Sequence, residues 1–209
     1  MLIALAVDVA LLAVGVGGVT ALAHHPRALA LLALWFVAYP LLTILRPTSG
    51  APREEERPDP ATVLLLTLIP LVTPLLSALA ERIGLWPLPG GDALRWSGVV
   101  ISAAGLALRI AAVHRLGSRF APVVAIERGH RLETGGVYAR LRHPGYLGAW
   151  LGNLGIILAF GSAATLPLAA AMAAVQVARI RVEERVLEQR FGDEFRSYRE
   201  RTGSFFPKL

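Results

Sequence analysis

The stretch TVLLLTLIPLVTPLLSALA, residues 62–80, decides the fold class of this chain. It is uncharged and has roughly the 20-residue length that an α-helix needs to cross the hydrocarbon core of a bilayer. A polar loop from Arg46 to Pro60 precedes it, and Glu81-Arg82 follows it. Such a segment predicts a transmembrane helix rather than a helix in a soluble core.

Apolar segments of similar character lie on both sides of this stretch. They run at about Leu2 to Ala23, Ala28 to Leu45, Ala93 to Val113, Tyr146 to Phe160 and Ala163 to Arg181. Because only two residues separate the last two segments, they predict a tight helical hairpin. The helical pattern then continues with charge on nearly every face, which predicts a cytoplasmic arm. We therefore expect an all-α integral membrane protein with about six transmembrane helices and a C-terminal helical arm.

The composition agrees with a membrane location. Hydrophobic residues make up 55% of the 209 residues, more than a soluble domain of this length normally carries. The formal net charge of +6 does not indicate nucleic acid, because the basic residues concentrate at 115–142 and 179–208, where they suit a membrane surface. With these clusters on one side, the positive-inside rule places both termini of a multi-pass protein in the cytoplasm. The Ala-, Leu- and Arg-rich composition favours a bacterial cell membrane.

The chain contains no cysteine, which excludes several kinds of chemistry. A disulfide framework, a thiolate nucleophile, a Cys-ligated zinc and a Cys-held iron–sulfur cluster are all ruled out. The sequence therefore predicts polar chemistry, and we expect no metal.

Polar residues of a kind that binds small charged molecules gather in the C-terminal half. The stretch LRHPGYLG, residues 141–148, contains Arg142, His143 and Tyr146, and Glu183-Glu184 follow across the hairpin. Pro144 suits the first turn of a helix, where free backbone N–H groups and the helix dipole favour an anion such as a carboxylate. This combination predicts a binding site for a small charged cofactor.

Three polar residues of the last helix share one face. Gln176, Arg179 and Glu183 follow the spacing that aligns side chains along a helix. Taken alone, Arg179 and Glu183 also fit a simple ion pair at the membrane interface, with the arginine reaching toward water. Arg109, inside the fourth apolar segment, is likewise either functional or close enough to the helix end to reach water.

The connection between the fourth and fifth apolar segments helps to divide the chain. Residues 114–145 are long for a connection in a compact membrane domain, and long ordered loops are usually functional. We therefore expect N-terminal transmembrane helices over 1–113 and a catalytic cofactor-binding region over 114–209, within one membrane domain. Gly148 and Gly152 in the fifth segment predict close packing against another helix.

The ordered motifs of the last 80 residues or so resemble a known family. They are His130-Arg131-Leu132-x-Thr134-x-Gly136-Val137-Tyr138, then Arg142-His143-Pro144-Gly145-Tyr146-x-Gly148, then Glu183-Glu184, Phe191-Gly192 and Pro207. This combination is similar to the isoprenylcysteine carboxyl methyltransferase family and its phospholipid methyltransferase relatives. The resemblance implies an integral-membrane methyltransferase that uses S-adenosyl-L-methionine and acts on a lipid-like or lipidated substrate among membrane lipids.

The resemblance also implies roles for particular residues. Arg179 takes the position that binds and orients the methyl acceptor. Glu133 stands where an apolar residue is expected, so a backbone contact is the safer assignment there. The cofactor contacts are expected at His130, Arg131, Leu132, Glu133, Tyr138, Arg142, His143, Pro144, Gly145, Tyr146, Glu183 and Glu184.

Elementary chemistry favours a carboxylate as the acceptor. The methyl donor is already activated, so transfer chiefly requires the acceptor to be held close to it in a dry site. A carboxylate is ionised at neutral pH and needs no general base, and an arginine can orient it. An amine acceptor would have to lose a proton, and an arginine beside it would repel the ammonium form. We therefore expect O-methylation rather than N-methylation.

Two other functions remain open at this stage. Some sterol reductases resemble this family in their C-terminal half but bind a nicotinamide cofactor, so an NADPH-dependent membrane reductase is one alternative. A membrane scaffold that binds anionic lipid through its arginines is the non-enzymatic alternative. The sequence identifies neither the acceptor and its tail nor the oligomeric state.

Overall fold

We describe residues 2–45, 54–56, 59–117, 124–126 and 132–208 in a computed structural model of the chain. The helices are α1 (Leu2–Val16), α2 (Val19–Ala23), α3 (Pro26–Ile44), α4 (Pro60–Arg82), α5 (Gly91–Leu116), α6 (Pro144–Phe160), α7 (Leu166–Phe191) and α8 (Asp193–Arg201). Two 3-10 turns, η2 (Gly136–Ala139) and η3 (Ala163–Thr165), and two strands, β1 (Glu54–Glu56) and β2 (Val124–Ile126), complete the described elements.

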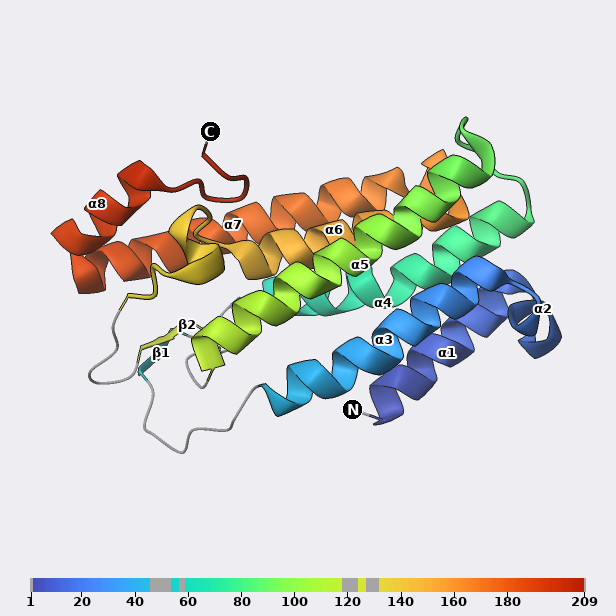
Figure 1. The fold of residues 1–209 in the computed structure, drawn as a ribbon, viewed down its shortest axis with the longest axis horizontal. Helices are drawn as coiled ribbons and strands as arrows, with labels where there is room; N and C mark the ends of the chain where they lie inside the picture. The colour runs from blue at the N-terminus through green and yellow to red at the C-terminus, as the bar shows by residue number, and fades with distance from the viewer. Residues whose placement is uncertain (1, 46–53, 57–58, 118–123, 127–131, 209) are drawn as a thin grey trace.

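The expected helical membrane fold is confirmed. Among the described residues, four segments are long and apolar enough to cross a membrane: α3, α4, α5 and Ala163–Phe191, which contains α7. Apolar helices α1 and α6 are shorter, so the count of six spans stays a prediction. Figure 1 shows the long helices lying side by side in a bundle. The sequence did not predict the small antiparallel ribbon in which β1 pairs with β2.

The first apolar segment is not one continuous helix as expected. Helix α1 ends at Val16, and the short helix α2 begins at Val19. Between them Gly17 and Gly18 have φ angles of +106° and +122°, a backbone conformation that is open mainly to glycine and incompatible with a right-handed helix. This pair of glycines shortens α1 and turns the chain toward α3.

The closest helix contact in the bundle joins α5 to α6. A Cβ atom built at Gly105 of α5 would lie 2.4 Å from the backbone nitrogen of Gly152 in α6. One built at Gly155 of α6 would lie 2.4 Å from the backbone nitrogen of Ser102 in α5. Gly98 and Gly148 make equally close approaches, so the two backbones touch along much of their length. The packing role expected for Gly148 is therefore seen, although its partner is α5.

The expected short connection between α6 and α7 is present. Gly161 ends α6 with a φ of +64°, and Ser162 donates a hydrogen bond of 2.5 Å to the Leu85 carbonyl in the α4–α5 connection. The backbones of these two connections also bond, from Leu88 to the Gly161 carbonyl at 2.8 Å. The hairpin is therefore held by its turn, while α6 packs mainly on α5.

The polar elements gather at one end of the bundle. Figure 1 shows β1, β2, α8 and the C-terminal tail at the end where α5 finishes and α6 begins, whereas α2 lies at the opposite end. At that opposite end, Glu81 accepts hydrogen bonds from Arg27 at 2.9 Å and His25 at 3.0 Å. The described residues of the motif at 141–148 lie at the end that carries α8, since α6 begins there.

We predict opposite effects for the same substitution at two neighbouring glycines. Gly105→Ala places a methyl group against backbone atoms that cannot move independently, which should cost about 1–3 kcal/mol. Gly152→Ala meets no atom within 4 Å and should be neutral or stabilise the helix by up to about 1 kcal/mol. Thermal unfolding of the detergent-solubilised protein, followed by tryptophan fluorescence, measures both. Equal midpoints for the two variants would contradict the close α5–α6 contact.

Candidate active site

One carboxylate joins three distant parts of the chain. Glu184 of α7 accepts hydrogen bonds from Arg142 Nε at 2.8 Å, from His143 Nε2 at 3.1 Å and from the Ser204 hydroxyl at 2.9 Å. The side chains of Arg142 and His143 are 8% and 3% exposed, so these bonds are shielded from water. Charge-assisted bonds in such a setting are stronger than neutral ones. Glu184 therefore fixes the start of α6 against α7 and the C-terminal tail.

The C-terminal tail continues this connection through its backbone. Arg142 N–H donates to the Gly203 carbonyl at 2.8 Å, and His143 N–H donates to the Ser204 carbonyl at 3.2 Å. Arg142 Nη1 also donates to the carbonyl and hydroxyl oxygens of Thr202. We expected free backbone N–H groups at the start of α6 to bind an anion. In the structure, the His143 N–H donates to a carbonyl of the C-terminal tail instead.

Tyr138 lies close to this arrangement and contacts both α8 and α5. The Tyr198 hydroxyl of α8 donates a hydrogen bond of 2.7 Å to the Tyr138 carbonyl. Burial raises the pKa of Tyr198 to about 12, so this hydroxyl keeps its proton and remains a donor at physiological pH. Tyr138 is itself buried, and its own hydroxyl lies 3.5 Å from the Ala112 carbonyl of α5.

A second polar group links α6 to α7 close to the first. The Tyr146 hydroxyl donates to Glu183 Oε2 at 3.2 Å, across the two helices. Arg179, only 5% exposed, interacts electrostatically with Tyr146. Pro144 and Gly145 lie between the two groups at the start of α6, and the Gly145 carbonyl accepts a bond of 3.0 Å from Arg109 Nη1. The structure thus brings Tyr146, Arg179 and Glu183 together.

The motif before η2 is described only in part. His130 and Arg131 lie outside the described residues. Leu132 is partly buried, and Glu133 Oε1 accepts hydrogen bonds from Arg115 Nε and from the Gly135 backbone N–H, both at 3.0 Å. The Glu133 side chain therefore helps to shape its own loop, and the expected backbone contact with a ligand stays a prediction.

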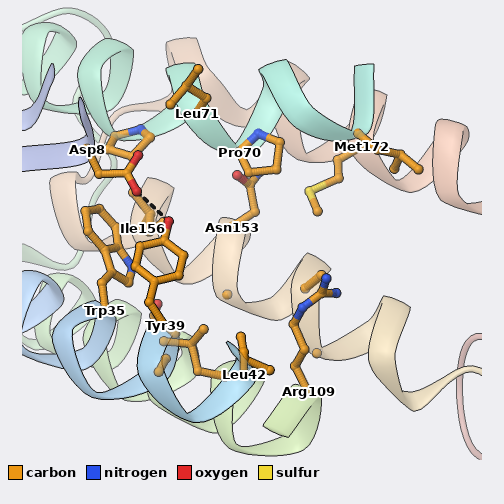
Figure 2. Close-up of a pocket in the computed structure, with 18 of the residues that line it drawn as sticks. Asp8, Trp35, Tyr39, Leu42, Pro70, Leu71, Arg109, Asn153, Ile156 and Met172 are labelled. Carbon is orange, nitrogen blue, oxygen red and sulfur yellow. Dashed lines mark hydrogen bonds between the residues drawn. The ribbon is translucent and has the colours of Figure 1, made fainter. Parts of the chain in front are cut away.

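A cavity of about 470 Å³ lies among the helices and reaches this end of the bundle. Its walls come from α1, α3, α4, α5, α6 and α7, and they include Tyr146 and Arg109. Figure 2 shows the cavity with the hydrogen bond between Tyr39 and Asp8 on one side and Arg109 on another. Most of the lining is apolar, so the cavity suits a largely apolar molecule.

Three cavity residues did not appear among the candidates drawn from the sequence. Ser102, Asn153 and Gln176 line the cavity and are buried, and each has a side-chain oxygen or nitrogen with no hydrogen-bond partner. The sequence gives only a weak indication that such residues bind a ligand. Single uncharged polar residues in apolar helices usually find a partner in a neighbouring helix. Gln176 had been recognised only as sharing a face with Arg179.

The described part of the chain contains no group of three or more His, Asp or Glu side chains that could hold a metal ion. The charged residues that come together are instead arranged as cation–carboxylate pairs, as at Arg142 and Glu184. Such an arrangement suits a small molecule that carries charges of both signs.

Comparison with known proteins gives a family match over the same region. Residues 98–189 match the model of the isoprenylcysteine carboxyl methyltransferase family. A protein-S-isoprenylcysteine O-methyltransferase of Schizosaccharomyces pombe is 35% identical over 108 residues, which cover 50% of this chain and 46% of that protein. The cobalt-zinc-cadmium resistance protein CzcN of Cupriavidus metallidurans is 37% identical over 121 residues, covering 55% of each.

The fold also matches a solved structure. The eukaryotic intramembrane Ras methyltransferase, an isoprenylcysteine carboxyl methyltransferase, superposes with a TM-score of 0.62 at 21% identity. The match covers 87% of this chain and 65% of that one. This likeness shows the fold. The chain spans about half the length of the curated relatives it matches.

The Glu184 contacts predict a large difference between two similar substitutions on α7. Glu184→Gln removes the charge that Arg142 and His143 bind in a shielded site, and it should cost about 2 kcal/mol. Glu188→Gln removes bonds to Arg196 and Arg199 on the surface and should cost less than about 1 kcal/mol. Thermal unfolding and limited proteolysis of the C-terminal tail measure the effect. A tail that stays protected in Glu184→Gln would contradict this account.

Proposed function

We propose that this chain, whose residues 98–189 match the model of the isoprenylcysteine carboxyl methyltransferase family, is a member of that family and a membrane methyltransferase. It transfers a methyl group from S-adenosyl-L-methionine to a lipid-like acceptor held within the bilayer. The acceptor's reacting group is a carboxylate. The proposal covers the substrate class, and the family name does not by itself identify the acceptor.

One observation carries this proposal. The cavity among the helices is largely apolar, yet it is lined at one end by Tyr146, whose hydroxyl binds Glu183. Arg179 lies beside the same tyrosine. An acceptor with an apolar tail and an anionic head fits this arrangement. Its tail can occupy the apolar cavity while its head binds the arginine.

The residues near Tyr146 also fit the charges of the cofactor. Glu183 accepts one hydrogen bond from Tyr146 and retains further acceptor positions for an ammonium group. When bound, S-adenosyl-L-methionine supplies a methyl group already activated on a positively charged sulfur. The residues proposed to hold it are His130, Arg131, Leu132, Glu133, Tyr138, Arg142, His143, Pro144, Gly145, Tyr146, Glu183 and Glu184.

We propose that these residues hold the cofactor in two ways, by direct contact and by supporting the residues that make that contact. Arg142, His143 and Glu184 bind one another and the tail, so we assign them to shaping the site and fixing the start of α6. Glu183 and Tyr146 are assigned to direct contact with the cofactor. The tail covers the start of α6, and we propose that this cover excludes water from the site.

Arg179 is the residue we assign to the acceptor. Its guanidinium is buried on α7 one helical turn from Glu183, and a buried arginine binds a carboxylate through two parallel hydrogen bonds. Orientation is sufficient here because a carboxylate is already ionised. An amine acceptor would meet repulsion from the same group, which favours O-methylation.

We further propose that this end of the bundle faces the cytoplasm of a bacterial cell, with residues 114–209 forming the catalytic region. Figure 1 supports a common side for both termini, since the start of α1 and the C-terminal tail lie toward the same end of the bundle. The basic residues after Arg179 suit the cytoplasmic side of a membrane.

The cofactor assignment predicts a ligand-binding result. The detergent-purified protein should bind S-adenosylhomocysteine with micromolar affinity in a calorimetric titration, and it should not bind NADPH. Glu183→Gln should weaken that affinity at least about tenfold, because a charge-assisted bond is lost. Glu188→Gln, on the same helix, is the matched control and should bind normally. Binding of NADPH but not of S-adenosylhomocysteine would contradict the methyltransferase assignment and support a reductase.

The acceptor assignment predicts a separate result for Arg179→Gln. This variant should keep its affinity for S-adenosylhomocysteine but lose at least about tenfold in kcat/KM for methyl transfer to lipid carboxylic acids. Transfer of a labelled methyl group measures the rate, with the same lipids carrying an amine as the comparison. Unchanged transfer to the acids, or faster transfer to the amines in the unmodified protein, would contradict a carboxylate acceptor.

A further inference from the structure

We propose that the cavity contains a recognition site for a second, neutral hydrogen-bonding group of the acceptor, formed by Asn153 with Ser102 and Gln176. This inference rests on the proposed function and refines its substrate class. It predicts that the preferred acceptor is a carboxylic acid whose tail carries a hydroxyl or an amide, rather than a plain hydrocarbon chain.

The side chains that form this site are buried and unpartnered. Asn153, Ser102 and Gln176 are 3%, 0% and 1% exposed. Both the nitrogen and the oxygen of the Asn153 amide lack a hydrogen-bond partner, as do the Ser102 hydroxyl and the Gln176 oxygen. All three residues line the same cavity. Unsatisfied atoms of this kind are rare in native proteins and require an explanation.

The energy of these atoms argues against a purely apolar occupant. Leaving a buried polar group without a partner is destabilising, and a hydrocarbon tail offers it no hydrogen bond. A ligand group that both donates and accepts would satisfy the Asn153 amide on both of its atoms. Because Asn153, Ser102 and Gln176 carry no charge, they would not compensate a second ion, so the ligand group must be neutral.

The site lies deeper in the bundle than the charged end. Asn153 follows Tyr146 by two turns of α6, a distance of about 10 Å along the helix. Gln176 precedes Arg179 by one turn of α7, in the direction away from Glu183. Figure 2 shows Asn153 extending from α6 toward Pro70 of α4. A tail that leaves the Arg179 end would pass Gln176 and then meet Asn153.

Two prolines leave backbone carbonyls of α4 without their usual donors. Pro70 and Pro74 have no N–H, so the carbonyls of Leu66 and Pro70 cannot receive the usual bond from four residues ahead. Leu66, Pro70 and Pro74 all line the cavity. By contrast, the Asp8 and Tyr39 side chains in its wall already bind each other. Both polar atoms of the Asn153 amide lack a partner, so we place Asn153 at the centre of the proposed site.

Competition binding without cofactor tests this site directly. The detergent-solubilised protein is loaded with a fluorescent fatty acid, which is then displaced by octadecanoic acid, by octadecanoic acids hydroxylated at successive chain positions, and by a chain-matched acid with an internal amide. We expect at least one hydroxy or amide acid to bind about tenfold more tightly than octadecanoic acid. Asn153→Leu should abolish that preference, chiefly by weakening the polar ligand.

Two further variants keep the test decisive. Ser102→Ala should reduce the preference several-fold, and it replaces Asn153→Leu if that variant does not fold. Ile156→Val, an apolar change in the same cavity and helix, should leave the preference intact. Equal affinity for all the acids, or a preference that survives both polar substitutions, would overturn the proposal. Since no cofactor is present, failure to bind S-adenosylhomocysteine would remove the methyltransferase function without altering this result.

Discussion

The contact between the backbones of α5 and α6 is the constraint on which the rest of the structure depends. Gly105 and Gly155 allow the two helices to approach until backbone atoms touch, which no larger side chain would permit. This approach lets Arg109 of α5 bond the Gly145 carbonyl at the start of α6. On the side of α6 where Gly152 meets no neighbour, the missing side chain leaves space that becomes part of the cavity. Glycine therefore creates both the contact and the opening.

The polar end of the bundle depends on that contact but is held by different forces. Once α6 is fixed on α5, its first residues can receive Glu184 from α7 and the carbonyls of Gly203 and Ser204 from the tail. These bonds join segments separated by about 20 to 60 positions in the sequence. Because these side-chain and backbone bonds converge on the start of α6, the cluster favours one arrangement of the tail. Glu183, the neighbouring carboxylate, is held toward Tyr146 instead, so two adjacent glutamates serve different partners.

The sequence predicted the membrane helices well because apolar length is a local property. It failed where the outcome depended on single backbone angles or on distant partners. The break at Gly17-Gly18 occurs within an unbroken apolar run, and hydropathy does not register a positive φ. Glu54–Glu56 pairs with Val124–Ile126 and so joins two loops. No periodic pattern in the sequence predicts this pairing. Likewise, the motif around His143 located the polar end, but only the fold reveals that Glu184 binds Arg142 and that Asn153 has no partner.

The cavity is lined by two parts of the chain, and only one of them lies within the family match. The match therefore does not identify the acceptor. The family match covers residues 98–189, which supply Arg109, Tyr146, Asn153 and Gln176. Asp8, Trp35, Tyr39 and Pro70 form other walls of the same cavity, and they belong to α1, α3 and α4, before the match begins. In the proposed function, the head of the acceptor would meet residues within the match, whereas its tail would also meet helices that the match does not include. Chemistry at the head can be shared across a family while the shape and polarity around the tail change with these helices. This separation is why a prenylated protein terminus does not follow as the acceptor from the family name.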